Sequence, residues 1–203
     1  MEHMVPITPA IKDIEATSDL LEKALKLAGL VTQMFREAGW ELVVVGGSAV
    51  EFYTEGAYMS NDIDLCRKTL EPIPLRKAQD LMAQLGARGG PRSWVIAGLF
   101  VDLLGFLENE ALTPCRELVT PFGTISIVPT ELAVVERVLL AFYPQPDNEA
   151  RDVAKKILAV CLSNPTSVEW EEVERLAGLD AFNITAELAV LKEEVANELQ
   201  SSA

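Results

Sequence analysis

The chain has 203 residues, of which 31 are acidic and 17 are lysine or arginine, so its formal net charge is −14. This charge opposes nonspecific binding to DNA or RNA, which depends on neutralising phosphates with lysine and arginine. Because His3 is the single histidine, acid–base or metal chemistry must run on carboxylates, and carboxylates favour hard cations such as Mg²⁺. The three cysteines show no metal-ligand spacing, and no apolar stretch is long enough to cross a bilayer. We therefore expect a cytoplasmic protein with no membrane partner.

The hydrophobic pattern changes along the chain, from mixed helix and strand to helix alone. In the first part, apolar spacing and turn residues predict helices at 18–38, 48–54 and 75–85. The same part contains predicted strands at 41–45, 62–66, 93–97, 99–104 and 124–128. Further helices are predicted at 130–142, with Thr130 as the N-cap, and at 149–162, 167–177 and 184–199. The pattern predicts an α+β core over residues 1–129 and a C-terminal helical region over residues 130–203.

A glycine turn separates the first predicted strand from the helix that follows it. Gly46 and Gly47 allow a backbone to pass close to a bulky ligand. The N–H groups at the start of a helix attract anions, above all phosphate. The Ser48 hydroxyl offers a further donor, and it would equally serve as the helix N-cap. The turn therefore predicts a phosphate-binding site.

Two aspartates lie two residues apart on the next predicted strand. Asp62 and Asp64 would point to the same face, with Ile63 facing the core. Two like charges held so close are costly unless a cation lies between them, and a divalent cation suits two carboxylates. Asp102 is a lone acid in an otherwise apolar strand, where a carboxylate is expensive unless it is paired or bound to metal. It is either the third carboxylate of a site for one or two ions or a charge facing water on an edge strand.

The residues that carry these features resemble a known superfamily. The runs 44–53 and 60–65, with the Gly-Gly-Ser turn followed by Asp-Ile-Asp, resemble the DNA polymerase β-type nucleotidyltransferases. The closer likeness is to the small prokaryotic proteins grouped with AbiEii toxins and minimal nucleotidyltransferases. The resemblance implies a nucleotidyltransferase-type mixed β-sheet flanked by helices.

The same resemblance implies a reaction and its residues. One or two Mg²⁺ ions would bind Asp62, Asp64 and Asp102, and a nucleoside triphosphate would lie near Gly47 and Ser48. The chemistry would be transfer of a nucleoside monophosphate to a hydroxyl, with release of pyrophosphate.

The sequence departs from the superfamily at its basic residues. Relatives often have an arginine and a threonine just before the acidic pair, where this chain has Tyr58 and Ser60. Many place a lysine in the helix after the core, where only Arg137 stands here. The other cations that could reach a triphosphate are Arg67, Lys68, Arg151, Lys155 and Lys156, of which Arg67 and Arg151 are predicted to bind the nucleotide.

Two functions therefore stay open at this point, beside the possibility that the motif match is chance and the chain is a structural, helix-rich domain. One is a nucleotidyltransferase, within a toxin–antitoxin module, whose acceptor is a protein, an RNA or a small molecule. The other is a catalytically weak or inactive nucleotide-binding or partner-binding protein of the same fold. Either would allow a protein partner or a homo-oligomer.

Overall fold

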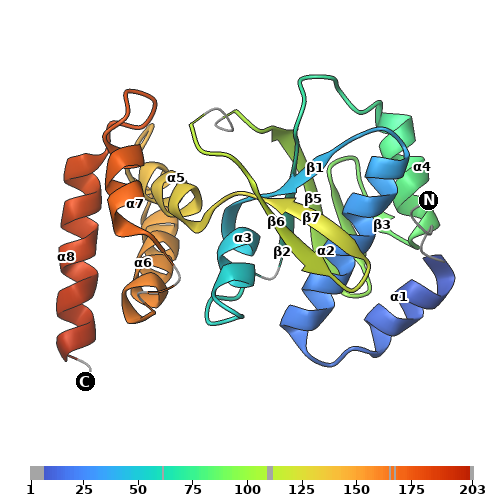
Figure 1. The fold of residues 1–203 in the computed structure, drawn as a ribbon, viewed down its shortest axis with the longest axis horizontal. Coiled ribbons are helices and arrows are strands. Elements are labelled where there is room, and N and C mark those ends of the chain that lie inside the picture. Colours follow the sequence, from blue (N-terminus) through green and yellow to red (C-terminus); the bar gives the residue numbers. More distant parts are fainter. Residues whose placement is uncertain (1–6, 61, 109–111, 165, 167, 202–203) are drawn as a thin grey trace. The chain divides into compact units, whose positions relative to one another are not determined.

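The computed structural model describes residues 7–201, apart from 61, 109–111, 165 and 167, so His3 lies outside the described residues. The chain divides into two compact units (Figure 1). The first unit comprises Met1–Ser48 and Met59–Val128, and the second comprises Ala49–Tyr58 and Pro129–Ala203. The division into two domains at residue 129 stays a prediction.

Within the described residues, the first unit contains a seven-stranded sheet in the order β3-β4-β5-β2-β1-β7-β6. Two pairs of neighbours, β2 with β5 and β1 with β7, are parallel, and the other pairs are antiparallel. The mixed sheet with its flanking helices confirms the predicted α+β class. The strands are β1 (Leu42–Val44), β2 (Asp62–Arg67), β3 (Arg88–Gly89), β4 (Ser93–Ile96), β5 (Leu99–Phe106), β6 (Arg116–Thr120) and β7 (Gly123–Ile127).

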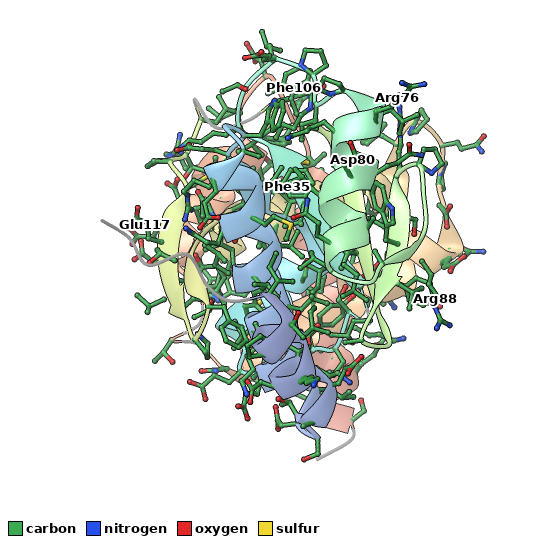
Figure 2. The ribbon with its side chains drawn as sticks, turned by 90° about the vertical axis from the view of Figure 1, so that its right-hand side faces the viewer. Phe35, Arg76, Asp80, Arg88, Phe106 and Glu117 are labelled. Atoms are coloured by element: carbon green, nitrogen blue, oxygen red, sulfur yellow. The ribbon has the colours of Figure 1, made fainter. Side chains whose placement is uncertain are left out.

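One face of this sheet is apolar and covered by helices. Ile63, Val101 and Trp94 are cross-strand neighbours on β2, β5 and β4, and each is at most 3% exposed. Helices α2 (Leu20–Glu37) and α4 (Leu75–Gln84) lie side by side across the sheet, and the fully buried Phe35 of α2 lies between them (Figure 2). These alternating apolar side chains place the main core of the first unit on this face.

Helix α2 is fixed at its start and packed closely along its length. The Asp19 carboxylate caps the helix by accepting a hydrogen bond from the Glu22 N–H at 2.8 Å. Gly29 faces β6, and a Cβ at this position would lie 2.0 Å from Thr120 Oγ1. The helix can therefore approach the sheet this closely only with glycine at residue 29.

The second unit is helical after residue 129, as predicted. Buried Glu131 in α5 accepts a hydrogen bond at 2.9 Å from the N–H of Glu169, the residue before α7. No described helix is long and apolar enough to cross a membrane. The helices are α5 (Thr130–Phe142), α6 (Asn148–Ser163), α7 (Trp170–Ala177) and α8 (Thr185–Ser201), while α3 (Gly46–Tyr53) begins in the first unit and ends in the second.

Some local predictions were wrong or missing. The N-cap of α5 is Pro129 rather than Thr130, which is the first helical residue. Ser48 is not an N-cap either, because α3 begins at Gly46. Helix α1 (Ile7–Ala16) was not predicted, although Pro9 is compatible with its first turn, where a missing N–H costs nothing. Strands β3 and β6 were also not predicted.

Candidate metal centre

The three predicted carboxylates lie together on the sheet. Asp64 on β2 is directly opposite Asp102 on the parallel neighbour β5, and Asp62 lies two residues before Asp64. One oxygen from each carboxylate lies within 4.8 Å of the other two. Strand β5 has neighbours on both sides, so the alternative of an edge-strand charge at Asp102 is wrong. In the part of the chain that the structure describes, this is the one group of three or more acidic, histidine or cysteine residues that could hold a metal ion.

Strand alternation explains how these charges are held beside an apolar core. Ile63 is 1% exposed and points to the covered face, which turns Asp62 and Asp64 to the other face. Asp64 is 9% exposed, and Asp62 and Asp102 are half-buried. Three partly buried carboxylates repel one another, and the repulsion strengthens as water is excluded.

The Asp102 carboxylate also shows a specific deficiency. Its Oδ1 atom is buried and has no hydrogen-bond partner among the described residues. A buried carboxylate oxygen without a partner is unfavourable, and a hard divalent cation is a ligand that would satisfy it. The carboxylate-only donor set and the unpartnered oxygen fit a metal-binding site.

The turn before α3 is fastened to the strand that carries the acidic pair. The Ser48 hydroxyl is fully buried, donates to the Val45 carbonyl at 3.0 Å and accepts from the Asp64 N–H at 3.1 Å. The Val45 N–H donates to the Asp64 carbonyl at 3.0 Å. The single hydroxyl hydrogen of Ser48 is therefore used within the fold. Any phosphate contact at Gly46, Gly47 and Ser48 would fall to backbone N–H groups.

Two further hydroxyl residues adjoin the carboxylates, and the sequence did not assign them a role. Ser60 donates a hydrogen bond from its hydroxyl to Asp62 Oδ1, which orients that carboxylate. Ser93 on β4 lies directly opposite Asp102 in the antiparallel register. Ser60 could have been found from the sequence, because it lies two residues before Asp62. Ser93 could not, because its position opposite Asp102 depends on strand pairing.

Of the two predicted cations, Arg67 lies in the same unit as this cluster but points away from it, and Arg151 lies in the other unit. The Arg67 guanidinium donates from Nη1 to the carbonyls of Leu70 and Glu71, at 3.1 and 2.5 Å, and its side chain lines a cavity together with Leu65. Leu65 alternates with Asp64 and points to the covered face. Arg151 belongs to the second unit, where its Nη2 pairs with a Glu194 oxygen at 2.6 Å.

The sequence matches no known protein-family model and no curated protein. Among solved structures, it is similar to an antigenic nucleotidyltransferase-like protein from Paracoccidioides brasiliensis, with a TM-score of 0.49 and 13% identity over 85% of this chain and 94% of that one. It is also similar to the antibiotic-resistance factor ANT(2'')-Ia, with a TM-score of 0.44 and 16% identity over 97% of this chain and 96% of that one. Both TM-scores are below 0.5, so these similarities support no function, and the proposed function rests on the geometry of the carboxylates.

Proposed function

We propose that this chain is a Mg²⁺-dependent nucleotidyltransferase that transfers a nucleoside monophosphate from a nucleoside triphosphate to a hydroxyl, releasing pyrophosphate. The observation that carries the proposal is the gathering of Asp62, Asp64 and Asp102, with one Asp102 oxygen buried and without a partner. Oxygen-only donors suit Mg²⁺ better than a softer metal. When bound, Mg²⁺ would neutralise the negative charge of the triphosphate and the charge that develops on the oxygens around the reacting phosphorus.

The residues around the site have separable roles in this proposal. Asp62 and Asp64 hold the cation, with Asp62 oriented by the Ser60 hydroxyl and the Asp64 backbone fastened by Ser48. The N–H groups at the start of α3 bind phosphate oxygens, since a helix N-terminus favours an anion. Asp102 completes the ligand set and accepts the proton of the incoming hydroxyl.

The test is transfer of label from an α-labelled nucleoside triphosphate in the presence of Mg²⁺, with pyrophosphate release measured in parallel. Asp64→Asn removes one ligand charge and should abolish Mg²⁺-dependent transfer. Asp80→Asn is the matched control, because Asp80 is an exposed carboxylate on α4 (Figure 2). Equal transfer by both variants would refute the proposed site.

A second candidate is a nucleotide-binding or partner-binding protein with weak or no catalysis. The positions of the two expected cations favour it, since Arg67 lines a cavity with Leu65, which points away from Asp64, and Arg151 pairs with Glu194. Calorimetric titration with ATP, GTP, CTP and UTP, with and without Mg²⁺, separates the two functions. Mg²⁺-dependent binding without label transfer to any acceptor in lysate would select the second.

The acceptor is most consistent with a protein side chain or a small molecule, because a net charge of −14 opposes RNA. A role in a toxin–antitoxin module, like a protein partner or a homo-oligomer, is proposed from the resemblance to the AbiEii group alone. Separating the labelled products of the lysate reaction into protein, RNA and small-molecule fractions identifies the acceptor class. Label in RNA would contradict the charge argument.

A further inference from the structure

A cavity of about 440 Å³ lies in the first unit, between the sheet and the start of α4. Leu65 and Leu103 line it, and each directly follows a metal-site carboxylate, Asp64 or Asp102, on its strand. Because successive side chains on a strand point to opposite faces, these leucines point away from the carboxylates. The other lining residues are Arg67, Pro72, Ile73, Leu75, Ala78, Pro91, Arg92, Leu104 and Gly105.

The charge of this cavity is opposite to that of the protein. Its lining contains Arg67 and Arg92 and no acidic residue, in a chain with 31 acidic residues. Cations that line an apolar cavity attract an anion, and arginine binds carboxylate and phosphate oxygens in a bidentate manner.

The Arg67 side chain is held by backbone carbonyls, whereas Arg92 is held at its backbone and its side chain is exposed. Arg67 donates to the carbonyls of Leu70 and Glu71, which fastens the loop that leads to Pro72 and Ile73. The Arg92 carbonyl accepts a hydrogen bond from the Leu103 N–H at 2.8 Å, which fixes its backbone beside β5. The Arg67 guanidinium is therefore already positioned, and less conformational freedom is lost when such a side chain binds a ligand.

The start of α4 adds to the same preference. Leu75 and Ala78, which line the cavity, belong to its first turns. Pro74 precedes the helix without a side-chain capping bond, and the first turn contains no acidic residue. The positive end of the helix dipole therefore reinforces the two arginines.

We propose that this cavity binds a small organic anion, with its carboxylate or phosphate head at the two arginines and a short apolar body against the leucines. Its volume lies within the range of small-molecule sites, and most of its lining is apolar, as such sites require. This proposal does not depend on the proposed nucleotidyl transfer, because its test measures ligand binding alone.

The test compares three probes with the same apolar body: 4-phenylbutyrate, 4-phenylbutyl phosphate and uncharged 4-phenylbutanol. Binding is measured by calorimetry and located by NMR of the backbone amides. We expect each anion to bind about tenfold or more tightly than the alcohol, because a charge-assisted hydrogen bond contributes more than 1 kcal/mol. The perturbed amides should include those of residues 65–67, 75–78 and 103–105. The anion that binds more tightly shows whether the cavity prefers a carboxylate or a phosphate head group.

Three variants complete the test. Arg92→Gln should weaken the anions about tenfold and leave the alcohol unchanged, whereas Arg88→Gln, at an exposed arginine outside the cavity (Figure 2), should leave both within about twofold. Ala78→Leu should fill the cavity and abolish binding of all three probes while the protein stays folded by circular dichroism. The proposal is overturned if the alcohol binds as tightly as the acids, if the two arginine variants behave alike, or if the perturbed amides lie elsewhere.

Discussion

The two units use their carboxylates in opposite ways. In the helical unit, Glu194 of α8 lies between Arg151 and Lys155 of α6, at 2.6 and 3.1 Å, and Lys155 also pairs with Glu198 at 2.8 Å. In the sheet unit, Asp62, Asp64 and Asp102 lie close to one another, and one Asp102 oxygen has no partner among the described residues. The helical unit supplies its own cations to join two helices. The sheet unit tolerates repulsion that a cation from outside would relieve.

The largest expected effect is on catalysis. Neutralising one carboxylate in each unit tests whether the two units differ as described. Asp102→Asn should lower nucleotidyl transfer by roughly a hundredfold or more, because it removes a ligand charge and the proposed proton acceptor. Glu194→Gln should leave transfer within about twofold, since Glu194 only pairs two helices. Both rates are measured as label transfer under saturating Mg²⁺ and nucleotide.

Equal loss of activity in the two variants would contradict the contrast between the carboxylates of the two units. The contrast would also fail if Asp102→Asn retains full activity while Asp64→Asn does not, since the site would then depend on β2 alone. Circular dichroism of each variant establishes that the fold is retained in either case.

The second effect is stabilisation by a divalent cation. At about one hundred times its dissociation constant, Mg²⁺ should stabilise the protein by about 2.7 kcal/mol, which corresponds to roughly 5 to 10 °C in the unfolding midpoint. Asp102→Asn should lose most of this shift. Without added metal, and with chelator present, the variant should unfold no earlier than the parent, because a repulsive and unpartnered charge has been removed. A parent protein that gains no stability from Mg²⁺ or Mn²⁺ would contradict the metal site.

The third effect concerns how the acidic pair is positioned. Ser48→Ala leaves the Asp64 N–H without its hydroxyl acceptor and should cost about 1 to 3 kcal/mol. The loss should be insensitive to salt, because neutral groups make both hydrogen bonds. Ser163→Ala, at an exposed serine that ends α6, is the matched control and should change stability by less than about 0.5 kcal/mol. Chemical denaturation measures both, and equal losses would remove Ser48 from the argument.

Strand alternation made the acidic pair predictable from sequence. A period of two places Asp62 and Asp64 on one face and Ile63 in the core, and this needs no knowledge of the partner strands. The same local logic predicted α2 and α4 with their boundaries to within two residues. Local periodicity therefore accounts for most of the α+β class.

The pairing of the strands could not be predicted from local sequence patterns. The register that sets Asp102 opposite Asp64, and Ser93 opposite Asp102, joins strands that are distant or reversed in the chain. The edge strand β6 was missed because its exposed residues include Val119, at 80% exposure, which reverses the usual pattern. The positions of Arg67 and Arg151 depend on hydrogen-bond partners that spacing does not reveal.

The smallest expected effect is the pH dependence of the helical unit. The hydrogen bond from Lys155, followed by that from Arg151, lowers the pKa of Glu194 below its ordinary value of 4.5. A depressed carboxylate pKa contributes stability that is present above the unfolded value and is lost as pH falls through the folded value. Glu194→Gln should therefore cost less than about 1 kcal/mol at neutral pH, since the pair is partly exposed, and the difference should shrink as pH falls below 4.5 or as salt rises. Glu193→Gln, at the exposed neighbouring residue, should show neither dependence. Thermal unfolding of the three proteins between pH 3 and 7 measures these differences, and a constant gap between Glu194→Gln and the parent would show that the cations do not act on Glu194 as the geometry requires.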